Sequence, residues 1–295
     1  MSASSDPLAA LLEGEFAGLL GGEFAGCCAE LYELPAVSWL LDGQLHPGGR
    51  ELTLRAAQLA GITEGSRVLD VASGAGTTAL LLAGELRARV VGVERGAEAV
   101  ARGRGTAAGA GLDGAVSFTT GDAASLPFAD ESMDAVVCEC SLCLFEDKPT
   151  AVREMARVLR PGGSVVIADV TVQANALPVA LRSAAARIAC IADALPLEGY
   201  ERLLRDAGLQ LHRTERHGDA LAALADRVEA RLRAARILRV PVLEPFRSEL
   251  DAAIELARVT QRAICDGIVG YALIAARRPA TSEGGRSSAA APAAA

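Results

Sequence analysis

Short apolar runs alternate with amphipathic segments over most of the chain. After Gly65 the runs read SRVLDV, ARVVGV, GAVSFTT, MDAVVC and GGSVVIADV. Segments with helical periodicity separate or follow them, at about residues 77–87, 97–110, 149–159 and 198–207. Strands that alternate with helices form βαβ units and a parallel sheet covered on both faces. The pattern therefore predicts an α/β domain.

Two further strands are expected near the C-terminus, GLQLHRTERH and IVGYALIAARRP. Between them lies a charged, helical stretch, about residues 218–264, which is longer than a simple connection requires. We expect this insertion to pack over the strand ends as a cap. The domain would run over residues 50–278, and the tail 279–295, without bulky apolar residues, is expected to be disordered.

An N-terminal helical segment, residues 1–49, precedes the domain and is expected to act as a lid. Within it, the pattern from Cys27 to Trp39 predicts a short helix that stops near Pro35. A turn at LHPGG then leads into an amphipathic helix at about residues 50–60.

Composition and charge exclude several classes of function. Hydrophobic residues make up 51% of the chain and aromatic residues 3%, so the core is built from Ala, Leu and Val. The net charge is −8, and no run of Lys and Arg is present to follow a phosphate backbone, which argues against a nucleic-acid partner. No basic leader or membrane-length apolar run is found, so we expect a cytoplasmic protein without a membrane partner. In that compartment the seven cysteines stay reduced and available for ligation or catalysis.

The stretch VLDVASGAG carries the first candidate site. A strand ends near Asp70, and the following residues, Ser73 to Gly76, form a tight loop that opens a helix. Glycines at 74 and 76 allow the backbone to approach a ligand closely. A third glycine at the offset of the dinucleotide fingerprint is absent.

Acidic residues follow the next two strands. Glu94 closes VVGVERG and can accept hydrogen bonds from both hydroxyls of a ribose. Asp122, in TTGDAASLPF, can accept from an exocyclic amine. Together with Asp70 these residues predict a cofactor crevice at successive strand ends.

This order of motifs, continued by MDAVVCECSLCLF and VLRPGG, resembles the class I S-adenosylmethionine-dependent methyltransferases. The resemblance implies a Rossmann-like sheet of seven strands with helices on both faces, the last strand running antiparallel between the fifth and the sixth. It also implies S-adenosyl-L-methionine as cofactor. The residues that it assigns to the cofactor are Asp70, Ala72, Ser73, Gly74 and Gly76 near the methionine part, Glu94 at the ribose, Arg95, Asp122 and Ala123 at the adenine, and Cys138 beside it.

The end of the fourth strand bears on the methyl acceptor. Amine methyltransferases of this family often carry Asn or Asp followed by two prolines there, whereas this chain has CECS. In an extended strand Cys138 and Cys140 share a face, with Cys143 in the loop beyond. Thiolates that converge suit a soft, thiophilic centre. The spacing is not that of a structural zinc site, so no metal site is expected.

A narrower resemblance is to the arsenite methyltransferases, in DAVVCECSLCLFEDK and ARIACIADALPLEGYERLLRDAGL. It assigns Cys140 and Cys190 to arsenic binding, with Cys27 or Cys28 as a further ligand. Cys143 and Cys265 are interpreted as packing residues. The resemblance implies that the acceptor is trivalent arsenic, free or as a glutathione conjugate.

Two other interpretations stay open. The chain could methylate carbon or oxygen of a small organic molecule, such as a quinone or natural product, with cysteines that only pack. It could also be a non-catalytic metalloid binder. For a base, only His46, His212 and His217 are available, and His46 in LHPGG could face the pocket.

Overall fold

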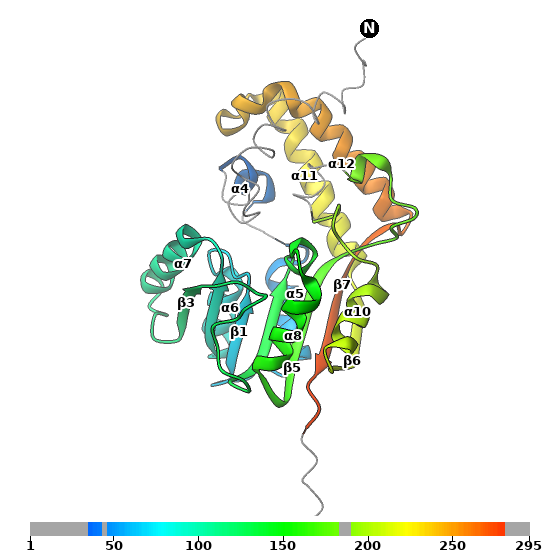
Figure 1. Ribbon diagram of the computed structural model, residues 1–295. Coiled ribbons are helices and arrows are strands. Elements are labelled where there is room, and N and C mark those ends of the chain that lie inside the picture. Colours follow the sequence, from blue (N-terminus) through cyan, green and yellow to red (C-terminus); the bar gives the residue numbers. More distant parts are fainter. Residues whose placement is uncertain (1–34, 43–45, 183–189, 281–295) are drawn as a thin grey trace, which may run out of the picture.

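The computed structural model describes residues 35–42, 46–182 and 190–280 (Figure 1). Within these ranges, seven strands form one sheet in the order β3-β2-β1-β4-β5-β7-β6. The strands are β1 (Arg67–Val71), β2 (Arg89–Glu94), β3 (Val116–Thr120), β4 (Met133–Glu139), β5 (Leu159–Val172), β6 (Gln210–Arg216) and β7 (Val269–Arg277).

The sheet is parallel except at β7. This strand pairs antiparallel with β5 on one side and with β6 on the other, with Ile274 opposite both Ile167 and Thr214. The predicted seven-stranded order, with the last strand between the fifth and sixth, is confirmed. Because β1, β2, β3 and β4 are parallel, their carboxyl ends lie along the same edge of the sheet.

Helices cover both faces of this sheet (Figure 1). The α-helices are α4 (Pro35–Leu41), α5 (Gly49–Leu59), α6 (Thr77–Leu86), α7 (Ala97–Gly109), α8 (Lys148–Val158), α10 (Leu197–Asp206), α11 (Gly218–Leu238) and α12 (Leu250–Cys265). Short 3-10 helices are η2 (Leu142–Leu144), η3 (Val179–Arg182) and η4 (Pro241–Glu249). The helices expected from sequence near 50–60, 77–87, 97–110, 149–159 and 198–207 correspond to α5, α6, α7, α8 and α10.

Side chains that alternate between the two faces of the central strands form two hydrophobic cores, one on each face of the sheet. Val137 of β4 belongs to the core under α5, α6 and α7, whereas its neighbour Val136 belongs to the core under α8 and α10. Val166 and Ile167 of β5 divide in the same way. Because successive side chains of a strand point to opposite faces, apolar runs fill both layers.

A third, smaller core lies above the sheet, where α4 packs with the helices that connect β6 and β7 (Figure 1). It contains Leu232 of α11, Ile254 of α12 and Ala36 of α4. The Arg231 guanidinium lies 4.4 Å from the centre of the Trp39 ring and adds a cation–π contact between α11 and α4. The helices inserted before the last strand thus form a layer with the N-terminal helix α4.

A helix that stops near Pro35 would lie outside the described residues and stays a prediction. Helix α4, which runs from Pro35 in the described part of the chain, was not expected from the sequence. Proline is compatible with the first helical turn because its missing N–H has no intrahelical partner there. The residues before Pro35 lie outside the described part of the chain.

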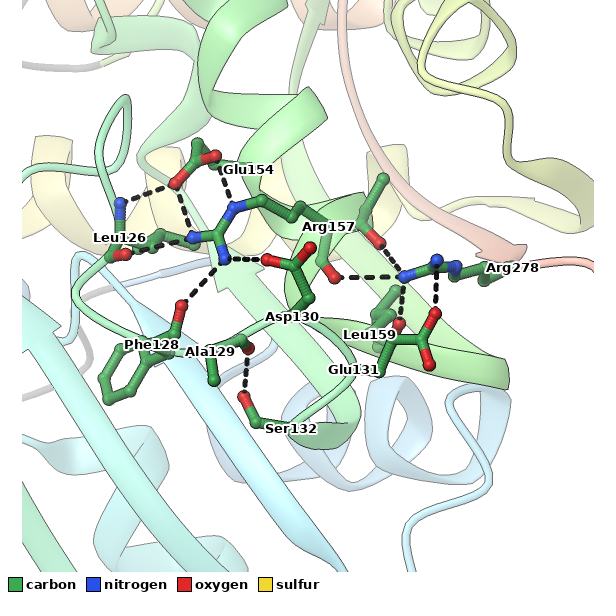
Figure 2. Close-up of polar contacts among 11 residues, drawn as sticks. Leu126, Phe128, Ala129, Asp130, Glu131, Ser132, Glu154, Arg157, Leu159 and Arg278 are labelled. Atoms are coloured by element: carbon green, nitrogen blue, oxygen red, sulfur yellow. Dashed lines mark hydrogen bonds and ion pairs between the residues drawn. The ribbon is translucent and has the colours of Figure 1, made fainter.

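Arginines secure the loop between β3 and β4, whose start carries Asp122. Arg157 donates to the carbonyl oxygens of Leu126 and Phe128 and pairs with Glu154 and Asp130, as Figure 2 shows. Arg278, just after β7, bonds the carbonyl oxygens of Ala156, Arg157 and Leu159 at the end of α8 and pairs with Glu131 (Figure 2). These contacts hold the loop to α8 and so help to position its other end at the strand edge.

Candidate active site

The loop between β1 and α6 forms a backbone cradle. Ala72, Gly74 and Gly76 all have positive φ, of 58°, 53° and 89°. The Ser73 amide donates to the Val93 carbonyl oxygen (3.1 Å), which joins the loop to β2. A Cβ atom at Gly76 would lie 2.2 Å from the Phe118 ring, whereas one at Gly74 would meet nothing within 4 Å. Gly76 is therefore required by packing, and Gly74 leaves open space beside the loop.

Glu94 holds this loop in place from the end of β2. Its carboxylate accepts hydrogen bonds from the amides of Gly74 (2.9 Å), Arg95 (2.7 Å) and Gly96 (3.2 Å). The residue is only 4% exposed. The predicted acidic residue at the second strand end is thus next to the glycine loop.

Asp70, at the end of β1, is a buried carboxylate with spare hydrogen-bonding capacity. The Ala79 amide donates to it, but its Oδ2 atom has no partner within the described residues. The Ser73 hydroxyl is likewise buried without a partner in that part of the chain. Burial and the nearby Glu139 charge raise the pKa of Asp70 well above its usual range.

The residues assigned to the adenine lie at the neighbouring strand ends. Asp122 accepts from the Ala124 amide (2.8 Å) and has its Oδ2 atom 4.0 Å from Arg95 Nε. Both side chains are more than half exposed. Ala123 packs against the core under α8 and α10.

A further acidic residue, Glu139, was not singled out from the sequence. It is the last residue of β4, and its carboxylate accepts from the hydroxyls of Thr78 (2.6 Å) and Thr53 (3.1 Å). His46 Nε2 lies 3.8 Å from it and 3.3 Å from the Thr53 hydroxyl. The sequence did carry a signal for Glu139. Acidic residues lie at the ends of β1 and β2 and just after β3, and Glu139 continues this pattern at the end of β4.

Three cysteines meet beside this edge. The Cys190 thiol donates to the Cys140 carbonyl oxygen (3.4 Å) and interacts with the thiols of Cys140 and Cys143. The neighbouring Cys190 thiol, then burial, raises the pKa of Cys140, and the same causes raise the pKa of Cys143. The expected pairing of Cys140 with Cys190 is thus seen as a contact.

One expectation about this cluster is wrong. Cys138 and Cys140 do not share a face: Cys138 belongs to the core under α8 and α10, whereas Cys140 packs against the opposite core. The strand ends at Glu139 and Cys140 has φ 52°, so the alternation of an extended strand stops there. Cys143, interpreted as a packing residue, is indeed fully buried but contacts the Cys190 thiol.

Asp169 of β5 lies under the thiols and was also missed from the sequence. Its carboxylate accepts from the amides of Cys143 (2.9 Å) and Val170 (2.8 Å). Burial, with the Cys190 charge as the next cause, raises the pKa of Asp169 from 3.8 to about 7. Tyr271 of β7 is buried with its hydroxyl facing Cys140.

The remaining candidates are outside this arrangement. Cys27 and Cys28 lie outside the described residues, so their place in the site stays a prediction. Cys138 is buried, with its sulfur 3.2 Å from the Ser141 hydroxyl, and burial raises its pKa. Cys265 is exposed at the end of α12. Over residues 35–42, 46–182 and 190–280, no three His, Cys, Asp or Glu side chains are arranged to hold a metal ion.

The edge described above combines a glycine-rich loop with buried acidic residues at the ends of neighbouring strands. The sequence profile of a family described as a methyltransferase domain matches residues 62–219, which is more than half of the chain. The chain belongs to this methyltransferase family. The methyl donor of the family is S-adenosylmethionine, and the open space at Gly74 with the unpartnered Asp70 Oδ2 and Ser73 Oγ fits such a ligand.

Three curated relatives are methyltransferases, and the names of two of them give different acceptors. Methyltransferase GfsG of Streptomyces halstedii is 37% identical over 172 residues, which cover 57% of this chain and 61% of the relative. The 27-O-demethylrifamycin SV methyltransferase of Amycolatopsis mediterranei is 32% identical over 54% of this chain and 59% of its own length. The arsenite methyltransferase of Halobacterium salinarum is 32% identical over 51% of this chain and 39% of its own. The matched region thus spans less than two thirds of each of these three relatives.

Solved structures share the fold. The [4+2]-cyclase SpnF superposes with a TM-score of 0.70 at 24% identity, covering 85% of this chain and 96% of that one. A putative sarcosine dimethylglycine methyltransferase from Galdieria sulphuraria gives a TM-score of 0.67 at 20% identity, covering 78% of this chain and 84% of the other.

Within the described residues, no helix is both long and apolar enough to span a membrane.

Proposed function

We propose that the protein is an S-adenosylmethionine-dependent methyltransferase whose acceptor is trivalent arsenic bound by Cys140 and Cys190. The observation that carries this proposal is the contact between these two cysteines just after β4, the strand that pairs with β1. They are 50 positions apart in sequence, and the Cys190 thiol reaches both the carbonyl oxygen and the thiol of Cys140.

The chain's own residues would hold the donor at the ends of β1 and β2. Asp70 and the backbone at Gly74 would bind its polar groups, while Glu94 keeps the loop in position. S-adenosylmethionine, when bound, supplies a methyl group carried on a positively charged sulfur. Because Cys140 directly follows β4, and β4 pairs with β1, the thiol cluster would lie beyond the end of the strand adjacent to the one that leads into the donor loop.

Protonated thiols suit arsenite as a substrate. The raised pKa of Cys140 and of Cys143 keeps these groups as thiols at neutral pH. Each thiol can condense with one As–OH group of arsenous acid, forming an As–S bond and releasing one water. No base is needed, and arsenic retains the lone pair with which it can accept a methyl group. Cys143, which contacts Cys190, would be the candidate for a third sulfur.

A second candidate is methylation of carbon or oxygen in a small organic molecule. It is favoured by the position of His46, a buried imidazole 3.8 Å from Glu139 at the end of β4. A base at this place could remove a proton from an acceptor hydroxyl. The name of the Amycolatopsis relative gives 27-O-demethylrifamycin SV as the acceptor, which agrees with this class.

One assay separates these functions. The full chain is incubated with methyl-labelled S-adenosylmethionine and glutathione, and with arsenite, a quinone or a polyketide hydroxyl compound in parallel. Label in methylated arsenic supports the proposal, whereas label only in an organic acceptor supports the second candidate. Tight arsenite binding without any methyl transfer would instead identify a metalloid binder.

A further inference from the structure

Glu139 is a buried carboxylate for which the arsenic chemistry has no use. It ends β4, and its side chain is 4% exposed. The hydroxyls of Thr78, in the first turn of α6, and Thr53, on α5, donate to it at 2.6 and 3.1 Å. Two helices and a strand therefore fix the position of this carboxylate.

Negative charge predominates around Glu139. Asp70, on the adjacent strand, is a second buried carboxylate, and its Oδ2 atom has no partner in the described part of the chain. The basic side chain near the pair is His46, whose Nε2 atom lies 3.8 Å from Glu139 and forms an ion pair with it only when the imidazole is protonated. Neither carboxylate has an ion pair with lysine or arginine within residues 35–42, 46–182 and 190–280. Buried carboxylates without a counter-charge are costly, so a ligand that brings a positive charge would be favoured.

The place of Glu139 indicates which charge this is. β4 lies between β1, which leads into the donor loop, and β5, which carries Asp169 under the thiols. Glu139 contacts Thr78 on the donor side and is covalently followed by Cys140 on the acceptor side. The donor carries two positive groups, its methionine ammonium and its sulfonium, and the one that would lie between donor and acceptor is the sulfur from which the methyl group departs.

We propose that Glu139, together with Asp70, forms a carboxylate pair that recognises the positive sulfur of S-adenosylmethionine and so distinguishes the donor from the neutral product. This inference rests on the proposed methyltransferase function but not on the identity of the acceptor. When the methyl group leaves, its sulfur becomes an uncharged thioether, and the pair loses its counter-charge. Weaker binding of S-adenosylhomocysteine then favours product release.

Binding measurements on the full chain test this role without catalysis. Dissociation constants are measured by calorimetry for S-adenosylmethionine, for its amine analogue sinefungin, and for S-adenosylhomocysteine. Glu139→Gln is expected to weaken binding of the two charged ligands about tenfold, the size of one partly screened charge interaction, with less than about twofold change for the product. Glu201→Gln is the matched control, because Glu201 also accepts a threonine hydroxyl, from Thr214 (3.0 Å), but lies on α10.

Equal losses for all three ligands would overturn the inference, since Glu139 would then act on the ammonium group that all three share or on the fold. No loss for any ligand would overturn it too, since Glu139 would then have no part in donor binding. Thermal unfolding reports whether Glu139→Gln folds. If Glu139→Gln does not fold, Glu139→Asp is used instead, because it keeps the charge on a side chain that is shorter by one methylene. Its affinity is expected to fall about threefold for S-adenosylmethionine and sinefungin alone. A wild-type chain that binds none of the three ligands would instead refute the proposed function itself.

Discussion

The Cys190 thiol lies 3.4 Å from the carbonyl oxygen of Cys140, and Asp169 lies beneath the thiol cluster that these residues form with Cys143. The contact joins the segment after η3 to the end of β4. Both cysteines have positive φ, 52° at Cys140 and 59° at Cys190. Positive φ is unfavourable for residues that have a β-carbon. Two such residues in contact therefore indicate that the surrounding structure holds the backbone in this conformation.

Replacement of either member of this pair is expected to impair arsenite binding. Cys140→Ser and Cys190→Ser should each lower arsenite affinity at least tenfold, because the loss of a direct ligand costs at least as much as the loss of a group that only orients one. Affinity for S-adenosylhomocysteine should stay within about twofold, since the donor loop is untouched. Cys265→Ser, at an exposed site on α12, is the control and should behave as wild type. Unchanged arsenite binding in both variants would remove the basis for the proposed acceptor.

Cys143 and Cys138 provide a matched comparison of two buried thiols. Cys143 contacts Cys190, whereas Cys138 points into the core on the other face of the sheet. Cys143→Ser is therefore expected to weaken arsenite binding about tenfold and to reduce the number of sulfur neighbours of arsenic measured by X-ray absorption. Cys138→Ser should leave both quantities unchanged. The reverse order of effects would show that Cys143 only packs.

The two glycines of the donor loop should differ in what they control. Gly76→Ala would place Cβ 2.2 Å from the Phe118 ring at φ 89°, and we expect a loss of about 2–3 kcal/mol in the free energy of unfolding. Gly74→Ala meets no atom within 4 Å and should cost about 1 kcal/mol, from the positive φ alone. Its Cβ would, however, enter the open space proposed for the donor. Urea unfolding and calorimetric titration with S-adenosylhomocysteine should thus show Gly74→Ala as stable but weakened in binding.

Asp169 is expected to make stability depend on pH. Its pKa is raised from 3.8 to about 7 on folding, so the folded protein binds this proton more tightly than the unfolded chain does. The contribution to the free energy of unfolding is therefore full below about pH 4, falls as pH rises toward 7, and is lost above it; the total change is up to about 4 kcal/mol. Asp169→Asn should remove this part of the slope in denaturant titrations between pH 4 and 8. A slope identical to that of wild type would show that Asp169 is ionised throughout.

The architecture could be predicted because it depends on local periodicity. Apolar runs such as MDAVVC between amphipathic segments specify βαβ units, and parallel strands bring Asp70, Glu94 and Asp122 to one edge. The family match and the strand order confirm the fold and the methyltransferase class. The pairing of Cys140 with Cys190 came from resemblance, since nothing in the spacing of two residues 50 positions apart requires that they meet.

The face on which each cysteine lies was decided by the tertiary structure. The sequence VVCECSLC reads as an extended strand with Cys138 and Cys140 on one side, but β4 ends at Glu139 and the positive φ of Cys140 turns its side chain toward the opposite core. The partners of Glu139, which are Thr53 and Thr78, come from two different helices. The sequence by itself thus determined the elements and the edge where chemistry takes place, because these follow from short-range patterns. Only the packed chain decided which side chains meet there, because a single backbone dihedral and contacts between distant segments leave no periodic signal.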